Sequence, residues 1–218
     1  MDNPFWPLFD LRIRTSRLEI RLPTDDDLVA LARLAKGGVH DATSMPFLKP
    51  WTDAPSPQLE RGLLQWGWRH RADWDPTKWS LNSAVFIDDE VVGVQDLMAT
   101  DFATLRSVKT GSWLGISKHG QGIGKEMRSA ILHFAFVGLG AAEALSGGWS
   151  DNASSLGVSK ALGYSENGRR LGLQRGVATE LIDLRLTRDE WDKQEHPRVE
   201  IEGLDGCLDF FVAQESKL

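Results

Sequence analysis

The segment 107–135 limits the possible folds more than any other part of the sequence, because it predicts a strand, a turn and a helix in immediate succession. Apolar and aromatic residues lie among small and polar ones over 107–116, as in a partly buried strand. The sequence HGQGIG that follows cannot prolong a strand and predicts a turn. Apolar residues then recur at helical spacing over 123–135, so this helix should bury one side. Its other faces are expected to carry Lys125, Glu126, Arg128 and Ser129.

A glycine-rich turn that opens a helix is a candidate phosphate site. Glycines let the backbone approach a ligand closely, and the first helical turn offers free N–H groups and a partial positive charge. The spacing excludes a P-loop, because His119 and Glu126 stand where that motif has glycine and Ser or Thr. It also disfavours a dinucleotide fingerprint, because Lys125 takes the place of the last glycine. A shorter glycine motif, Gly120 to Gly124, remains.

This strand, turn and helix in mid-chain resemble the pyrophosphate-binding turn of the GCN5-related N-acetyltransferases (GNAT). The stretch DNASS at 151–155, with a helical run to LGY at 162–164, is similar to the N-x-x-S helix of that family, which ends in L-G-F or L-G-Y. The stretch TSRLEIR at 15–21 is similar to the first strand, T-x-R-L-x-L-R, of the RimJ/RimL-like branch, whose members acylate protein N-termini. The three motifs occur in the family's order.

The resemblance implies an α/β fold with a mixed, mostly antiparallel central sheet flanked by helices. It also implies that the fourth and fifth strands splay apart and admit the pantetheine arm of the cofactor. The sequence agrees with this arrangement, because a hairpin is predicted over 79–97 and a final hairpin over 169–186. A strand at 144–149 should run parallel to the strand at 107–116, since a helix connects them.

Length and composition set the domain organisation. The chain has 218 residues, of which 41% are hydrophobic, enough to fill one sizeable core. We expect a GNAT-like acyltransferase domain over 1–192. The segment 193–218 should be an extension that packs on this domain or forms an interface, because 198–212 is too apolar for a free tail.

The resemblance implies that acyl-CoA is the co-substrate, with pyrophosphate recognition by the N–H groups of the turn. His119 stands where the family usually has Arg or Gln, and could contact a phosphate or lie in solvent. Asn152 could bind the pantetheine amides, cap its own helix, or do both. The predicted cofactor-binding residues are Trp113, Leu114, Gly115, Ile116, His119, Gln121, Gly122, Ile123, Gly124, Lys125, Asn152 and Ser155.

Acyl transfer by direct attack of an amine needs a stabilised oxyanion and a proton for the leaving thiolate. The resemblance assigns the oxyanion to a backbone N–H of the splayed strand, here Leu114 or Gly115. The tyrosine that often protonates the thiolate is replaced by Ser159. Ser155, the serine of N-x-x-S, is therefore the candidate acid. Alternatively, Ser155 satisfies the backbone of its own helix.

The general base is where the sequence departs from the RimL-like pattern. Those enzymes carry a glutamate shortly before the fourth-strand motif, where this sequence has Lys109 and Thr110. Asp96 and Asp101 are candidate substitutes, or else they are solvated loop acids. An α-amine, with a pKa of about 8, needs less help than a lysine amine with a pKa of about 10. The missing glutamate therefore favours an N-terminal amine as acceptor.

The sequence leaves both the acceptor amine and the acyl group undetermined. The resemblance places the acceptor groove in the segment 39–77, where Phe47 and Trp51 could contact the substrate or pack beneath a proline-rich loop. Acetyl is the family's usual acyl group, but an acidic group such as succinyl would need a cationic partner. The candidates for that partner are Lys109, His119 and Arg170.

The composition of the chain limits which binding partners and cofactors are expected. The formal net charge of −6 argues against a nucleic-acid partner and fits a cationic amine. We expect no membrane partner and a cytoplasmic location, because no apolar run reaches the roughly 20 residues of a membrane span and the N-terminus does not resemble a signal peptide. With one cysteine, Cys207, and no Cys/His cluster, we expect neither an internal disulfide nor a metal. A homo-oligomer is compatible with the sequence.

Two other functions compete with an N-acyltransferase for protein amines. The first is a catalytically weak CoA-binding sensor or assembly subunit, which the missing tyrosine and glutamate would suit. The second is an acyltransferase for small molecules such as antibiotics, which would differ only in its acceptor.

Overall fold

Alternating apolar residues in β3 (Lys78–Ile87) and β4 (Glu90–Thr100) give the sheet two buried faces. On one face, Leu81 and Val85 belong to the main core cluster, which includes the buried side of helix α4 (Ile123–His133). On the other, Ala84 and Phe86 form a smaller cluster with helix α1 (Asp25–Lys36), while α2 (Gln58–Ala72) packs against it. Helices therefore cover both faces.

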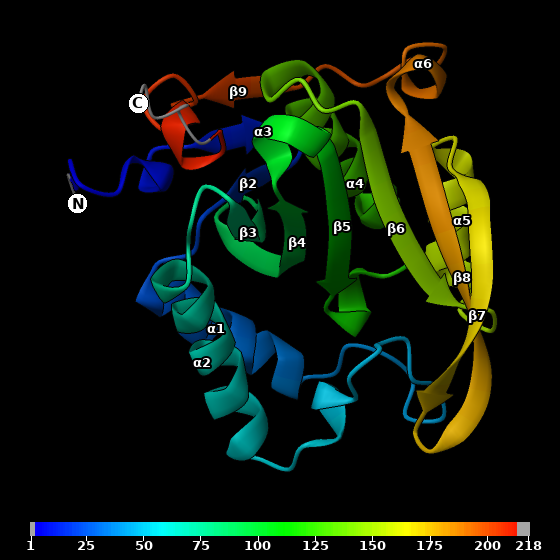
Figure 1. The fold of residues 1–218 in the computed structure, drawn as a ribbon. Helices are drawn as coiled ribbons and strands as arrows, with labels where there is room; N and C mark the ends of the chain where they lie inside the picture. Colours follow the sequence, from blue (N-terminus) through cyan, green and yellow to red (C-terminus); the bar gives the residue numbers. More distant parts are fainter. Residues whose placement is uncertain (1–2, 213–218) are drawn as a thin grey trace.

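The computed structural model describes residues 3–212. Within this range the sheet has nine strands in the order β7-β8-β6-β5-β4-β3-β2-β1-β9, with helices packed around it (Figure 1). The pairings are antiparallel except that of β5 with β6, which is parallel. The predicted mixed, mostly antiparallel α/β fold is confirmed.

The remaining elements follow in chain order. The other strands are β1 (Arg12–Arg14), β2 (Glu19–Arg21), β5 (Ser107–Leu114), β6 (Glu143–Trp149), β7 (Ser165–Gln174), β8 (Val177–Thr187) and β9 (Glu200–Glu202). The other α-helices are α3 (Phe102–Leu105), α5 (Ala153–Ala161) and α6 (Arg188–Trp191). Short helical turns lie at Pro7–Phe9, Trp51–Asp53, Ile116–Lys118 and Leu208–Phe210, and a π-helical turn, Phe134–Gly138, extends α4. Among residues 3–212, no helix has both the length and the apolar character of a bilayer-crossing segment.

Strands β5 and β6 separate soon after they meet. They pair only from Ser107 to Lys109 on β5 and from Glu143 to Leu145 on β6. Beyond these residues β5 stays paired with β4, and β6 stays paired with β8. The two strands diverge visibly in Figure 1. This gap is the splay that the sequence predicts.

The glycine turn and the start of α4 are tied to the N-terminal strands. The Thr15 hydroxyl donates to Glu126 Oε1 at 2.6 Å, and Arg17 Nε donates to Glu126 Oε2 at 2.8 Å. Arg17 also reaches the Gln121 carbonyl oxygen at 3.5 Å. These bonds hold the first turn of α4 against the connection between β1 and β2.

The C-terminal segment completes the sheet and the core. Strand β9 pairs antiparallel with β1. Phe211 is fully buried, and its carbonyl oxygen accepts a hydrogen bond from the Trp79 indole at 3.0 Å. Cys207 is a buried free thiol whose pKa is raised to about 12 by that burial. Residues 1–2 and 213–218 of the two predicted segments lie outside the described residues.

Candidate active site

A groove of about 1120 Å³ opens where β5 and β6 part. Its walls come from the loop before α2, from α2 itself, from β4 and β5, from the glycine turn, and from the start of α5. The predicted site residues that line it are Phe47, Trp51, Asp96, Trp113, Leu114, His119, Gly122, Ile123, Gly124, Lys125, Asn152 and Ser155. The groove thus brings together predicted site residues from four parts of the chain, 47–51, 96, 113–125 and 152–155.

Three of the predicted cofactor-binding residues, Gly115, Ile116 and Gln121, lie at the edge of the groove or outside it. A Cβ on Gly115 would collide with the Leu34 side chain of α1, so this residue faces the helix rather than the groove. The Ile116 side chain is exposed. The Gln121 side-chain amide donates to the Ser117 carbonyl oxygen at 2.9 Å.

The glycine turn has the backbone that an anion site needs. Gly120 and Gly122 have φ angles of +73° and +77°, which residues with a Cβ rarely adopt. Gly122 precedes the first turn of α4, and no side chain caps that helix end. Its first N–H groups therefore keep their donor capacity and the positive end of the helix dipole.

The amide of Leu114 is directed at the gap, and that of Gly115 is not. The Gly115 N–H donates to the Val92 carbonyl oxygen at 3.0 Å, next to the pairing of β5 with β4. Because successive residues in a strand direct their N–H and C=O groups to opposite edges, Leu114 directs its own toward β6. His119 Nε2 lies 3.2 Å from the Leu114 carbonyl oxygen. Of the two oxyanion donors expected from the sequence, Gly115 is engaged elsewhere.

The start of α5 carries Asn152 and Ser155. Asn152 Oδ1 accepts a hydrogen bond from the Ser155 N–H at 3.1 Å and so caps the helix. The capping bond uses the backbone N–H of Ser155 and not its hydroxyl. The Ser155 hydroxyl oxygen lies 3.9 Å from the point where a Cβ added to Gly148 of β6 would be. Ser159, one turn later, is fully buried and donates to the Ser155 carbonyl oxygen at 3.0 Å.

Asp96 and Asp101 have different surroundings. Asp96 lies on β4, faces Gly111 across the strand pair and accepts a hydrogen bond from the Asn82 side-chain amide. Burial raises the pKa of Asp96 to about 7, although the Asn82 bond acts in the opposite direction. Asp101 is exposed and lies outside the groove. The structure therefore brings one of the two predicted acids to the site.

A row of aromatic rings forms the wall beside Asp96. The Phe47 and Trp51 rings lie 5.1 Å apart, and Trp51 lies 5.6 Å from Trp113 of β5. The Trp149 indole donates to the Phe47 carbonyl oxygen at 3.2 Å, which fixes the loop over the end of β6. These rings make an apolar part of the groove wall, and Asp96 lines the same groove.

Arg128 is a residue of the groove lining that the sequence pattern misplaces. Helical spacing puts it on a polar face, but the side chain is 6% exposed and lines the groove. It donates to Ser159 Oγ at 2.8 Å and to Ser112 Oγ at 3.1 Å. Helical spacing alone cannot show that α5 and β5 both close over this part of α4. The three cations that the sequence offers for an acidic acyl group, Lys109, His119 and Arg170, also line the groove.

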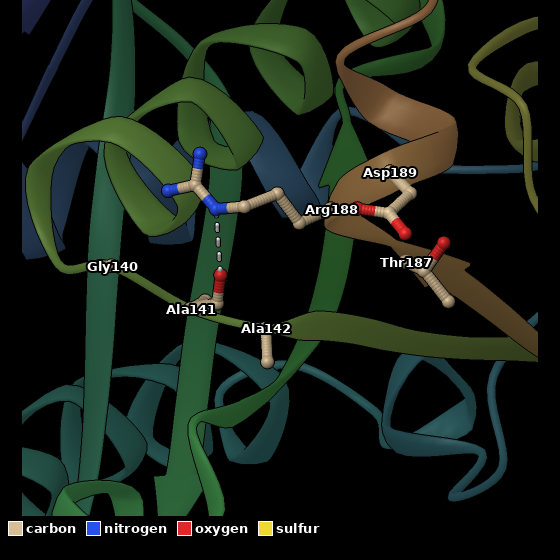
Figure 2. A pocket seen from close by; sticks show the side chains of 6 residues that line it. All are labelled: Gly140, Ala141, Ala142, Thr187, Arg188 and Asp189. Atoms are coloured by element: carbon tan, nitrogen blue, oxygen red, sulfur yellow. Dashed lines mark hydrogen bonds between the residues drawn. The ribbon is translucent and has the colours of Figure 1, made fainter.

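A smaller hollow of about 370 Å³ lies at the opposite end of β6 (Figure 2). The Arg188 side chain extends over it and donates from Nε to the Ala141 carbonyl oxygen at 3.4 Å. A second nitrogen of the same guanidinium donates to the Phe136 carbonyl oxygen. These bonds join α6 to the end of α4, so we assign the hollow a structural role.

Residues 17–165 match the family model described as acetyltransferase (GNAT) domain. This match spans more than half of the sequence, and the splayed strands and the glycine turn are part of it. The chain therefore belongs to the GNAT acetyltransferase family. Within residues 3–212, no group of three or more His, Cys, Asp or Glu side chains is arranged to hold a metal ion.

Solved structures with the same fold include three acetyltransferases. RimL, a ribosomal L7/L12 alpha-N-protein acetyltransferase in complex with coenzyme A, is 17% identical with a TM-score of 0.64, over 81% of this chain and 97% of that one. A ribosomal-protein-S5-alanine acetyltransferase from Vibrio fischeri is 18% identical with a TM-score of 0.62, over 83% and 98%. A chimera of the spermidine N-acetyltransferase SpeG from Vibrio cholerae and hSSAT is 13% identical with a TM-score of 0.64, over 82% and 100%.

Proposed function

We propose that the protein is an acyl-CoA-dependent N-acyltransferase that moves an acyl group from the CoA thioester to a primary amine by direct attack in a ternary complex. The observation that carries the proposal is the glycine turn at the end of β5, whose free amides open into the gap between β5 and β6. The pyrophosphate would bind these amides at Gly122 to Lys125.

The gap accounts for the rest of the cofactor. From the turn, the pantetheine arm would lie along β5 in the gap toward β6, which leaves the Leu114 N–H for the carbonyl oxygen of the thioester. Asn152, at the N-terminus of α5, lines the far wall of the groove and would meet the arm from there. The thioester would then lie between β5 and the Ser155 hydroxyl.

Asp96 is the proposed general base. A carboxyl group with a pKa of about 7 is charged in part of the molecules at neutral pH and can accept a proton from an ammonium acceptor. The neutral amine attacks the thioester carbonyl carbon, and the Leu114 N–H stabilises the oxyanion. As the C–S bond breaks, Ser155 is the proposed donor of a proton to the sulfur.

The acceptor and the acyl group are less closely defined. The rings of Phe47, Trp51 and Trp113 line the same groove as the Asp96 carboxyl group, which suits an amine attached to an apolar or peptide chain. The fold is shared with enzymes named for ribosomal-protein and spermidine acetylation, so we propose a protein N-terminus first and a small amine second. Acetyl is the proposed acyl group. Succinyl is the alternative, with Lys109, His119 or Arg170 facing its carboxylate.

The test is release of CoA thiol from acetyl-CoA or succinyl-CoA in the presence of N-terminal peptides, lysine peptides and spermidine. Turnover with at least one amine is expected, with loss in Ser155→Ala and Asp96→Asn. Asp101→Asn is the matched control, because this acid lies outside the groove, and it should keep wild-type activity. CoA binding without turnover on any amine would reject the enzyme and favour the sensor.

A further inference from the structure

Arg128 carries a buried positive charge without a buried negative one to balance it. The side chain extends from the second turn of α4, and its two hydrogen bonds go to the neutral hydroxyls of Ser112 and Ser159. Its Nε has no partner. Among residues 3–212, the 16 ion pairs do not include Arg128. An arginine cannot lose its proton to relieve this charge, so an uncompensated guanidinium is costly to bury.

A structural arginine in the same protein looks different. Arg188 also reaches inward, but its guanidinium bonds to the main-chain carbonyl of Ala141 (Figure 2). It bonds to that of Phe136 as well. Carbonyl oxygens are strong acceptors that satisfy such a group. Arg128 instead meets two hydroxyls and the open groove. Packing between α4 and α5 does not by itself require a charged side chain there.

The position of the guanidinium is close to where the two strands part. Ser112 lies on β5 shortly beyond Lys109, the last residue of that strand paired with β6. The opposite wall of the gap is built from Ser146 and Gly147, which leave room between the strands. Moving along β5 away from the glycine turn, a ligand meets Leu114 first and then Ser112. The reactive end of an acyl-CoA anchored at the turn would therefore extend toward Arg128.

Acyl transfer creates a negative charge at that end. The amine nitrogen forms a bond to the carbonyl carbon, the C–S bond breaks, and the electron pair of that bond stays on sulfur. Because Asp96 already holds the proton taken from the ammonium, the surplus proton of the nitrogen is released to water, from which Ser155 regains its own proton after it protonates the sulfur. The sulfur is then a thiolate until it receives a proton from Ser155 or water.

We propose that Arg128 stabilises this thiolate by hydrogen bonding and charge. The inference rests on the proposed function, because it needs CoA bound in the gap. It adds a catalytic residue for the departure of the leaving group. Because the guanidinium keeps its own proton, its effect is electrostatic, and the final protonation of sulfur remains a separate event.

The direct test is the thiol pKa of CoA bound to the protein, followed by thiolate absorbance against pH. Neither an acceptor nor turnover is needed. In the wild-type complex, we expect the thiol pKa to lie at least about one unit below that of free CoA, a roughly tenfold larger thiolate fraction at pH 8. Arg128→Met should remove the shift and Arg128→Lys should keep part of it. Arg33→Met, which removes an exposed arginine of α1, is the control and should leave the shift intact.

The outcomes separate the inference from the function that it rests on. CoA bound to the wild-type protein with the thiol pKa of free CoA would overturn the role of Arg128 alone, whatever the folding of the variants. No CoA binding at all would overturn the proposed function as well. If Arg128→Met keeps the thiol shift but loses a preference for succinyl-CoA over acetyl-CoA, the arginine binds an acyl carboxylate and the thiolate role is rejected.

Discussion

Asp96 shows how the protein environment sets the chemistry of one residue. An aspartate in water has a pKa near 3.8 and would be too weak a base to matter at neutral pH, whereas burial beside Asn82 raises the pKa of Asp96 to about 7. Once an acceptor amine has been identified, the pH profile of its kcat/KM should therefore show a rising limb with an apparent pKa near 7. Asp96→Asn should remove this limb and lower kcat/KM by about 100-fold or more. A pH profile of both proteins is the measurement, and an unchanged limb in the variant would exclude Asp96 as the base.

The same shift has a consequence for stability. The folded-state pKa of about 7 lies above the unfolded value of 3.8, so the folded protein binds more protons between these pH values. The free energy of unfolding should therefore fall as the pH rises from about 4 to 7. Asp96→Asn removes this loss and should be more stable than wild type at pH 8, by up to about 4 kcal/mol, with a gain below about 1 kcal/mol at pH 4. Urea unfolding at the two pH values measures it, and an equal effect at both would contradict the raised pKa.

For single residues, the sequence predicts a role well when that role depends only on neighbouring residues in the chain. The Asn152 cap involves only the next turn of its own helix, so its motif suffices to predict it. The prediction fails where burial comes from distant segments. The helical pattern places Arg128 on a polar face, because nothing near it in the sequence shows that Ser112 and Ser159 close over it.

At the element scale, the glycine turn depends on a support from the N-terminal strands. Glu126 accepts hydrogen bonds from Thr15 and Arg17, and Arg17 also reaches the Gln121 carbonyl oxygen. Glu126→Gln should loosen the turn and weaken CoA binding by several-fold. Glu180→Gln, which removes an exposed partner of Arg169, is the matched control. Calorimetric titration with CoA measures both, and equal affinities would show that the turn holds its shape without Glu126.

Elements built from neighbouring residues are the ones that the sequence predicts well. The strand, turn and helix over 107–135 and the two long hairpins follow from local periodicity and turn residues. The first strand expected from the sequence, within residues 15–21, is only part of the arrangement, because β1 precedes it and pairs with β2 across the turn at Thr15. The sequence predicts that the last segment packs on the domain or forms an interface, but it does not show the partner strand, because β9 pairs with β1 across most of the chain.

At the scale of the whole molecule, the segment that contains Phe211 stabilises the main core. Phe211 is fully buried and touches the rings of Trp79 and Phe134. Phe211→Ala should lower the free energy of unfolding by about 3–5 kcal/mol, because it leaves a cavity that these rings cannot fill. Phe5→Ala is the control, since that ring is 87% exposed, and it should change stability little. Chemical denaturation measures both, and a loss below about 1 kcal/mol for Phe211→Ala would mean that the C-terminal segment is not part of the cooperative core.

The central claim is that the glycine turn holds the pyrophosphate of an acyl-CoA. Mass spectrometry of the intact complex, with acetyl-CoA and succinyl-CoA titrated in turn, tests it most directly. The wild-type protein should bind one acyl-CoA per chain. Gly122→Val should abolish binding, because it disturbs the turn at a φ of +77°. Gly140→Val forces the same backbone strain, at a φ of +72°, outside the groove, and should still bind. Absence of binding to the wild-type protein, or undiminished binding to Gly122→Val, would contradict the account.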